Sequence, residues 1–421
     1  MKIIMIVIDG LFDEPNPKLG NKTPLEVADV KTIKSLLKNS VVGLIDNRLI
    51  QTVVTSDIAV ARLLGLRLEN LHDIPRSILE IISENIPFKN GNLALHCNFA
   101  TINIETSEII DRRAGRTLKR GEAKILERDI NTRVKLERAD FIFKHIIDYV
   151  SVLVFKDPER DLSIEISETD PWRPGEEKKL KLCKPLGENV CALASCKHLN
   201  EFTLKSIEIL NTHPVNIYRR LMGLLPVNCI ICRQPGNKLP SIKGNFKDNF
   251  NLIGAAQARL PTERGIAKLI GLNVIDLPLI EPFENLGAYY YERAIQIIEN
   301  IKYYDFIYAH IDEADDAAHD RDPMKKKNVI EVIDRFFLSE IVEYIMSRGE
   351  EITLILTADH GTSSITGHHL NTIVPALIYN PKFKREKAIE FNEHLEHSRV
   401  DFYIKAEDFM SKIVLELARR V

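Results

Sequence analysis

The sequence predicts an α/β protein with a mainly parallel sheet, helices on both faces of that sheet, and an inserted α+β domain. Short apolar runs alternate with helix-like segments near both ends of the chain, an order typical of parallel sheets. The alternation stops between about residues 67 and 235, and 421 residues exceed one ordinary hydrophobic core. We therefore expect residues 1–66 and 236–421 to form a core, with residues 67–235 as the inserted domain.

Composition and charge are those of an ordinary globular protein. Hydrophobic residues make up 45% of the chain, charged residues 28%, and the formal net charge is -3. This balance gives no reason to expect nucleic acid or an acidic membrane surface as a partner. The run from Lys2 to Ile8 is too short for a signal-peptide core or a membrane span, so we expect a first strand and a cytoplasmic protein. Oligomeric state stays open.

Six cysteines in a chain of this length do not make a disulfide framework. Cys229 and Cys232 are three positions apart on a predicted strand, so they face opposite sides and do not chelate together. A zinc site with loose spacing is a less favoured alternative, and its ligands would be Cys183, Cys191, Cys196 and His198. The preferred expectation is free thiols in a reducing compartment.

The first core segment opens with a strand over residues 2–8 that ends at Asp9-Gly10. Thr23-Pro24-Leu25-Glu26 predicts a helix start, because Thr caps, Pro suits the first position and Glu favours the first turn. This helix is expected to continue through residues 33–37. Short strands are predicted over residues 41–45 and 52–55.

The next helix is predicted to begin at Ser56. Serine is a good N-cap, Asp57 lies in the first turn, and Gly65 marks the end. In the inserted domain, strands are predicted over 93–104, 141–143, 150–155 and 227–232, helices over 121–133 and 201–211, and an exposed loop over 169–184. This mixture is α+β in character.

The α/β alternation returns after residue 240. Strands are predicted over 251–256, 273–275, 305–311, 352–358 and 374–379, and helices over 265–272, 289–301, 329–346 and 406–419. Several predicted strands of the core, from both ends of the chain, are followed by residues whose side chains can bind metals or act as nucleophiles. They are Asp9, Ser56, Asp315, His319, Asp359 and His360, with His369 further along the chain.

These side chains are expected to meet, because open α/β sheets place their sites at the carboxyl ends of strands. Asp315 and His319 are four residues apart and share one face of a helical turn. Taken singly, each residue has an ordinary explanation as a turn, a cap or a surface group. Together, carboxylates and imidazoles suit divalent metals, and a serine at a helix N-terminus suits a bound phosphate. The set predicts phosphoryl transfer at two metal ions.

Several motifs carry a family resemblance over nearly the whole chain. They are Asp9-Gly10, residues 22–28, Thr55-Ser56-Asp57, residues 97–101, Ile110-Asp111-Arg112-Arg113-Ala114-Gly115-Arg116, Thr169-Asp170-Pro171, residues 213–216, Asp315-(x3)-His319-Asp320 and Thr357-Ala358-Asp359-His360. In this order they resemble the archaeal-type cofactor-independent phosphoglycerate mutases of the alkaline phosphatase superfamily. The Asp-Arg-Arg-Ala-Gly-Arg block is the most specific of them.

The resemblance implies an alkaline-phosphatase-like core with two divalent ions (Mn, Mg or Zn) and an inserted transferase domain. It implies interconversion of 3-phosphoglycerate and 2-phosphoglycerate, a step of glycolysis and gluconeogenesis, through a phosphoserine at Ser56. Asp9, Asp359 and His360 match ligands of the metal that also binds Ser56. Ligands of the second metal are matched by Asp315, His319 and His369, with His369 preferred to His368 for its distance to Val374-Pro375. Substrate contacts are matched by Arg76, Asp111, Arg112, Arg113 and Arg116.

The chain departs from the family pattern where substrate is bound. Ile58-Ala59-Val60 replaces Thr-Ala-His, and Pro75-Arg76-Ser77-Ile78 keeps only the Arg of a Gly-Arg-Gly-Pro loop. His96 stands for an Arg, Asp148-Tyr149 for a His-Arg pair, and Asp312 or Glu313 for a Lys. Lost positive charge should weaken phosphate binding, since each charged hydrogen bond contributes roughly 1.5–3 kcal/mol. Alternatives are a metal-dependent phosphatase or phosphomutase on another phosphomonoester, and a weakly active or non-catalytic paralogue.

Overall fold

The protein divides into two compact units in a computed structural model. Unit 1 comprises residues 1–71 and 242–421, and unit 2 comprises residues 72–241. The structure describes residues 2–49, 53–66, 74–171, 177–242, 244–278, 280, 282, 285–348, 352–386 and 389–420. The expected boundary at residues 66 and 67 adjoins a stretch outside these ranges, and the expected boundary after residue 235 falls inside a strand of unit 2.

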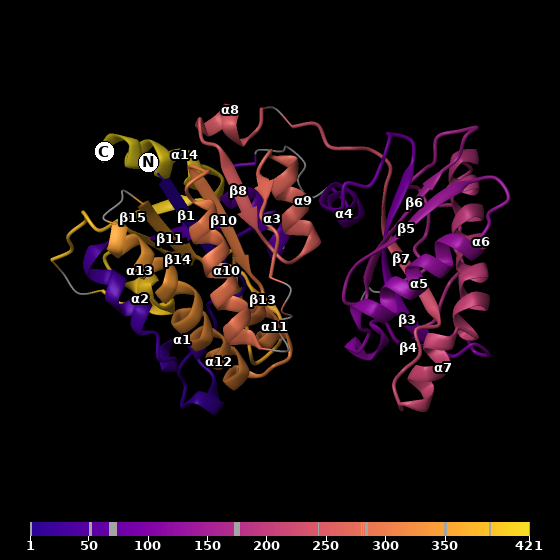
Figure 1. Ribbon diagram of the computed structural model, residues 1–421, viewed down its shortest axis with the longest axis horizontal. Helices are drawn as coiled ribbons and strands as arrows, with labels where there is room; N and C mark the ends of the chain where they lie inside the picture. The colour runs from indigo at the N-terminus through magenta and orange to yellow at the C-terminus, as the bar shows by residue number, and fades with distance from the viewer. Residues whose placement is uncertain are drawn as a thin grey trace. The chain divides into compact units, whose positions relative to one another are not determined.

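Unit 1 is built on one eight-stranded sheet with the order β15-β2-β14-β11-β1-β10-β8-β9 (Figure 1). Its strands are β1 (Lys2–Ile8), β2 (Ser40–Asp46), β8 (Gly254–Gln257), β9 (Asn273–Val274), β10 (Phe306–Ile311), β11 (Ile352–Thr357), β14 (Val374–Tyr379) and β15 (Phe402–Lys405). Within this sheet β14 pairs antiparallel with both of its neighbours, and the other pairings are parallel. The predicted mainly parallel sheet is confirmed.

The central strands are continuous apolar runs because helices cover the sheet. β1 lies between β10 and β11, with Val7 opposite His310 on one side and Thr357 on the other. All residues of β10 and β11 are buried. This register brings the carboxyl ends of three parallel strands to one edge.

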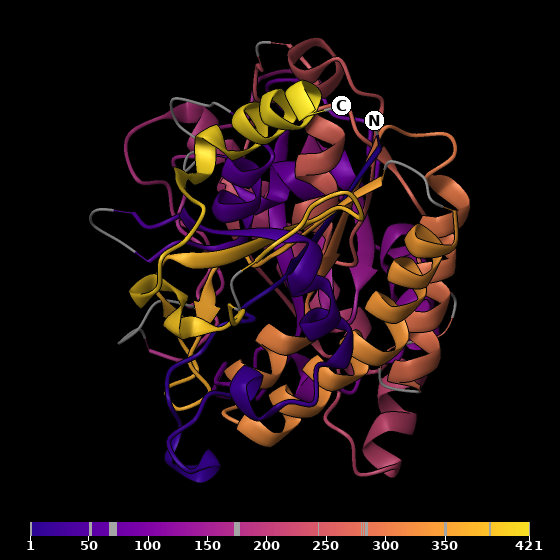
Figure 2. The same cartoon turned by 90° about the vertical axis from the view of Figure 1, so that its left-hand side faces the viewer.

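The helices of unit 1 pack in two groups. One contains α1 (Pro24–Val27), α2 (Lys31–Leu36), α10 (Leu286–Asn300), α11 (Glu313–His319), α12 (Pro323–Ile333) and α13 (Ser339–Arg348), and the other contains α3 (Ser56–Leu63), α9 (Pro261–Leu269) and α14 (Ala406–Arg420). Figure 2 shows the orange helices of the first group well apart from the yellow α14. Shorter elements of this unit are α8 (Phe246–Phe250) and the small strands β12 (Gly361–Thr362) and β13 (His369–Leu370).

Several predicted elements of unit 1 differ in detail from the structure. Thr52 lies outside the described residues, and residues 53–55 are not strand. The helix expected to run on from Thr23 is two helices, α1 and α2, because Ala28 after α1 is extended. The single long helix expected over 329–346 is interrupted by a π-helical turn, η5 (Asp334–Leu338). Ser56 is the first residue of α3 and Thr55 is its N-cap.

Unit 2 is an α+β domain around an antiparallel sheet. Its strands are β3 (Leu93–Ile102), β4 (Ile109–Asp111), β5 (Asp140–Ile147), β6 (Val150–Lys156) and β7 (Cys229–Gly236). The helices are α4 (Arg76–Ser83), α5 (Arg120–Arg133), α6 (Val190–Asn211) and α7 (Pro214–Leu221). β3 pairs with β4, β6 and β7, so it is the centre of the sheet, and all ten of its residues are buried.

The cysteines of unit 2 correct one expectation. Cys183 and Cys196 form a disulfide, so they are not free thiols. Since His198 pairs with Asp157 and two of the supposed zinc ligands are bonded to each other, this set does not form the alternative zinc site. Cys97 and Cys232 lie opposite each other on β3 and β7, with their sulfur atoms 3.0 Å apart.

Candidate functional site

The carboxyl edge of the unit 1 sheet gathers acidic and imidazole side chains. Asp9 follows β1, Asp359 and His360 follow β11, and Asp312 follows β10. These positions are forced by the parallel register, since the three strands end side by side. All four residues are almost fully buried. Buried carboxylates are costly unless charges or a metal ion compensate them.

Ser56 lies against this cluster from the first turn of α3. Its Oγ is 3.0 Å from His360 Nε2. The same Nε2 is 3.2 Å from Asp9 Oδ1 and 3.4 Å from Asp359 Oδ2. The structure thus brings together the four residues that were predicted to share one metal.

A second group lies beside the first. His319 Nε2 is 3.0 Å from Asp315 Oδ2, as expected for residues four apart on α11. His369 Nε2 is 3.3 Å from His319 Nε2 and 3.9 Å from Asp315 Oδ1, and its ring stacks on His360 at 3.8 Å. His368 is exposed. The geometry therefore favours His369 over His368.

Mutual repulsion shapes the titration of these groups. Burial, together with the carboxylates of Asp359 and Asp315, raises the pKa of Asp9 well above its usual range. Burial has the same effect on Asp359, but the imidazoles of His360 and His310 outweigh it and lower the pKa of that carboxyl. The hydrogen bond with Asp315 raises the pKa of His319. The site gathers more negative charge than it balances.

These residues fit divalent ions. Three sets hold ligand atoms within 4.8 Å of one another, namely Asp9 with Asp359 and His360, Asp315 with His360 and His369, and Asp9 with His310 and Asp312. Asp9 Oδ1 and Asp359 Oδ2 are buried and accept no hydrogen bond from the part of the chain that the structure describes. Carboxylate oxygen and imidazole nitrogen are ligands that Mn, Zn and Mg accept to different degrees. A cation would satisfy both the orphaned oxygens and the excess charge.

Neighbouring residues hold the ligands in place. Thr362 Oγ1 donates to Asp315 Oδ1 at 2.5 Å and lies 3.2 Å from His360 Nδ1. Gly10 has φ of +60°, and a Cβ there would meet Asp315 Oδ1 at 2.6 Å. Glycine is therefore required beside Asp9 both for its backbone conformation and for the space it leaves.

Sequence reasoning missed three residues at this edge: His310, Asp312 and Thr362. Asp312 was treated only as a replacement of a family lysine. His310 Nδ1 lies 2.7 Å from Asp312 Oδ1, and its other nitrogen faces Asp9 and Asp359. The position of His310 and Asp312 could have identified them, because both lie at the carboxyl end of the strand predicted over residues 305–311.

Unit 2 presents a basic pocket. Four of the five predicted substrate residues line it, namely Asp111, Arg112, Arg113 and Arg116. Lys178 lines the same pocket. Arg112 donates to Asp170 through Nε at 2.7 Å and Nη2 at 2.6 Å, and Asp170 also accepts from Arg233. Asp170 is buried, so the loop that was expected to be exposed over residues 169–184 is buried at its start.

The backbone of this pocket is strained. Ala114, Gly115 and Arg116 have φ of +48°, +69° and +53°, in the left-handed region that non-glycine residues rarely adopt. Strain of this kind costs about 1–3 kcal/mol per residue and clusters at ligand sites. It turns the Arg-Arg-Ala-Gly-Arg segment tightly, so that several guanidinium groups share one pocket.

The fifth predicted residue, Arg76, begins α4 and does not line that pocket. Nearby on the same helix, Glu80 Oε1 lies 2.5 Å from His96 Nδ1, and both side chains are buried. His96 occupies the position of a family arginine. At this position the chain has a buried imidazole paired with the Glu80 carboxyl.

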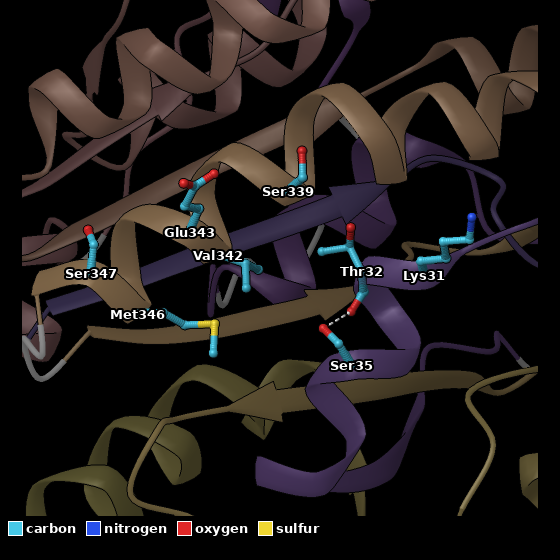
Figure 3. A pocket seen from close by; sticks show the side chains of 8 residues that line it. All are labelled: Lys31, Thr32, Ser35, Ser339, Val342, Glu343, Met346 and Ser347. Carbon is cyan, nitrogen blue, oxygen red and sulfur yellow. Dashed lines mark hydrogen bonds between the residues drawn. The ribbon is translucent and has the colours of Figure 1, made fainter.

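Another surface hollow lies between α2 and α13 and is lined by Lys31, Thr32, Ser35, Ser339, Val342, Glu343, Met346 and Ser347 (Figure 3). It contains none of the predicted site residues. Among the described helices, none is both long and apolar enough to cross a membrane.

The chain is similar in sequence to known proteins of one family. The model of the family described as 2,3-bisphosphoglycerate-independent phosphoglycerate mutase matches residues 38–216. A mutase of this name from Aeropyrum pernix is 34% identical over 390 residues, covering 90% of each chain. The enzyme named 2,3-bisphosphoglycerate-independent phosphoglycerate mutase 1 from Methanocaldococcus jannaschii is 33% identical, covering 100% of this chain and 98% of its own.

Two solved structures resemble the structure of this chain. The cofactor-independent phosphoglycerate mutase from Thermoplasma acidophilum superposes with a TM-score of 0.62 and 26% identity, covering 99% of this chain and 100% of its own. A Pyrococcus horikoshii protein shares the fold with a TM-score of 0.74 at 22% identity, covering 100% of this chain and 98% of its own. Sequence motifs, fold and full-length relatives converge, and the chain belongs to the 2,3-bisphosphoglycerate-independent phosphoglycerate mutases, a family of metal-dependent isomerases.

Proposed function

We propose that this chain interconverts 3-phosphoglycerate and 2-phosphoglycerate through a phosphoserine at Ser56, with two divalent ions of Mn, Mg or Zn. The observation that carries the proposal is the position of Ser56 Oγ, 3.0 Å from His360 Nε2 at the edge where Asp9 and Asp359 gather. A nucleophile, a metal-ligand set and a helix N-terminus coincide there. The reaction is a step of central carbon metabolism, so we place the protein in the cytoplasm.

The ligands divide into two sets. Asp9, Ser56, Asp359 and His360 would hold one ion. Asp315, His319 and His369 would hold the other. When bound, such ions activate a hydroxyl and neutralise the charge of a transferring phosphoryl group. Buried, orphaned oxygens on Asp9 and Asp359 support the first set.

The residues of unit 1 then perform two transfers. Ser56 Oγ attacks the phosphorus of 3-phosphoglycerate, the bond from phosphorus to the 3-oxygen breaks, and that oxygen takes up a proton. The free amides of the first turn of α3 stabilise the phosphoryl group on Ser56. Attack by the 2-hydroxyl of the retained glycerate breaks the bond to Oγ and gives 2-phosphoglycerate, and Ser56 regains its proton.

We propose the basic residues of unit 2 as binding groups for the carboxylate and hydroxyls of glycerate. Arg113 and Arg116 line the pocket of unit 2, and guanidinium groups bind carboxylates in a bidentate manner. Asp111 accepts from the Arg113 backbone N–H at 2.6 Å, which fixes the turn. Arg112 is already paired with Asp170, so we assign it mainly to shaping the pocket. Arg76 is proposed as a further phosphate or carboxylate contact.

One assay tests the proposal. Purified protein with Mn²⁺ and 3-phosphoglycerate should form 2-phosphoglycerate with little free phosphate, and Ser56→Ala should lose this activity by roughly 10³-fold or more. Ser35→Ala, an exposed serine on α2, is the matched control and should retain it. Release of phosphate without 2-phosphoglycerate would instead show a phosphatase. No turnover with metal bound would show a non-catalytic paralogue.

A further inference from the structure

We propose that His310 is an additional ligand of the metal ion held by Asp9 and Asp359, and that Asp312 orients it. The inference deepens the proposed function, on which it rests for the presence of the ion. His310 is the next-to-last residue of β10 and is fully buried. It lies between the two carboxylates and the interior of the sheet.

The two nitrogens of His310 have different partners. Nδ1 is 2.7 Å from Asp312 Oδ1, a hydrogen-bond distance. Nε2 has no hydrogen-bond partner, although it is buried. A carboxylate that accepts from Nδ1 fixes the tautomer in which Nε2 carries a free lone pair. Such a carboxylate-histidine pair is the usual arrangement around a metal-binding imidazole.

Distances indicate what Nε2 faces. It is 3.8 Å from Asp9 Oδ2 and 3.9 Å from Asp359 Oδ2. Both separations are too long for a hydrogen bond, whose N···O distance is about 2.7–3.2 Å. They suit two ligands of one ion, because ligand atoms each about 2.0–2.2 Å from a metal lie at most about 4.4 Å apart.

The orphaned atoms point to the same conclusion. Within the described residues, buried atoms without a hydrogen-bond partner include His310 Nε2, Asp9 Oδ1 and Asp359 Oδ2. A single ion would satisfy all three residues. Asp312 Oδ2 is buried without a partner as well, and Asp312 belongs to a candidate ligand set with Asp9 and His310. We assign it to orienting the ring, because its Oδ1 is at hydrogen-bond distance from Nδ1. Arg293 Nη2 donates to the His310 carbonyl at 2.7 Å, which holds the end of β10 in place.

The test compares metal binding by the intact protein and by three variants, without substrate. His310→Gln should weaken Mn²⁺ binding at one site by about 10-fold or more and alter the visible spectrum of the Co²⁺-loaded protein. Asp312→Asn should have a smaller effect in the same direction. Tyr308→Phe, which removes another buried polar atom from β10, should leave Mn²⁺ affinity and the Co²⁺ spectrum unchanged.

A folded His310→Gln protein with wild-type Mn²⁺ affinity and an unchanged Co²⁺ spectrum would overturn the inference. If that variant does not fold, Mn²⁺-loaded crystals of the wild type decide, since the anomalous peak must lie roughly 2–2.3 Å from Nε2. A more distant peak also overturns it. Loss of metal affinity in His310→Gln, with no mutase activity in the wild type, would support the ligand and refute the proposed function. Mutase activity in the wild type, with unchanged metal affinity in His310→Gln, would support the proposed function and refute the ligand.

Discussion

At the scale of single residues, His368 and His369 are neighbours in sequence with opposite environments. His369 stacks on His360 and faces Asp315, whereas His368 is exposed. We expect His369→Ala to weaken binding of one of the two proposed ions by at least about 10-fold and to lower mutase activity. His368→Ala is the matched control. Titration of both variants with Mn²⁺ checks this, and equal affinity in the two proteins would contradict the assignment.

The Glu80–His96 pair predicts a pH dependence of stability. Burial raises the pKa of Glu80 and lowers the pKa of His96, so the folded pair holds one proton. The unfolded chain holds none above its His pKa of about 6.5, one between about 6.5 and 4.5, and two below that. The free energy of unfolding should therefore fall as pH rises above about 6.5.

Glu80→Gln tests this, because the amide keeps the shape of the protonated carboxyl and does not titrate. Relative to wild type, the variant should gain stability between pH 6.5 and 8, by up to about 1.4 kcal/mol per pH unit. Urea unfolding at several pH values measures the difference. Glu343→Gln, at an exposed position on α13, is the control. A pH-independent difference for Glu80→Gln would refute the one-proton pair.

At the scale of elements, the π-helical turn η5 interrupts the helix that was predicted over residues 329–346. It presents Asp334 to the start of α2, where Oδ2 and Oδ1 accept from the backbone N–H groups of Thr32 and Ile33 at 2.9 Å each. A side chain from another helix thus caps α2. No local sequence pattern reveals such a cap.

Asp334→Ala should therefore destabilise the protein by about 2 kcal/mol, since two amide groups lose their acceptor. Urea unfolding monitored by circular dichroism gives this value. Glu343→Ala, on the exposed side of α13, serves as the control and should change stability by less than about 0.5 kcal/mol. A change of similar size in both variants would show that the cap is not responsible.

What the sequence predicted depended on local signals. Thr23 caps α1 as expected, with Glu26 in the first turn completing a capping box, and the predicted strand 2–8 is β1 to the residue. The residues at the strand ends could be chosen because parallel register alone brings them together. Asp334 could not, since its role depends on partners far away in the sequence. His310 also lies at a strand end, but the carboxylates that its Nε2 faces, on Asp9 and Asp359, come from other strands. The short parallel edge strand β15 and the helices α4 and α7 were also missed, because each is short.

At the scale of the whole molecule, unit 1 concentrates buried carboxylates that a cation must balance. Removal of divalent ions with a chelator should lower the melting temperature, because an ion that binds only the folded state stabilises it by about 2.7 kcal/mol at 100 times its Kd. The pKa of Asp9 is raised in the folded protein, and this gives the direction in which the stability of the ion-free protein changes with pH. As pH rises, the ion-free protein loses the proton that shields Asp9, and its stability falls.

Calorimetry with and without Mn²⁺ checks both effects. The gap between the two melting temperatures should widen as pH rises through the raised pKa of Asp9. A control titration with Na⁺ at equal ionic strength separates specific binding from screening. An unchanged melting temperature in the chelator would mean that the carboxylate edge does not bind metal in the folded protein.

The most direct test of the central claim is to find the phosphoryl group on Ser56. Wild-type protein is mixed with Mn²⁺ and phosphorus-labelled 3-phosphoglycerate, quenched in acid within one turnover, digested, and analysed by mass spectrometry. We predict label on the peptide that contains Ser56, localised to that serine, and its loss when the reaction is chased with unlabelled substrate. Formation of labelled 2-phosphoglycerate without any label on Ser56 would contradict the account.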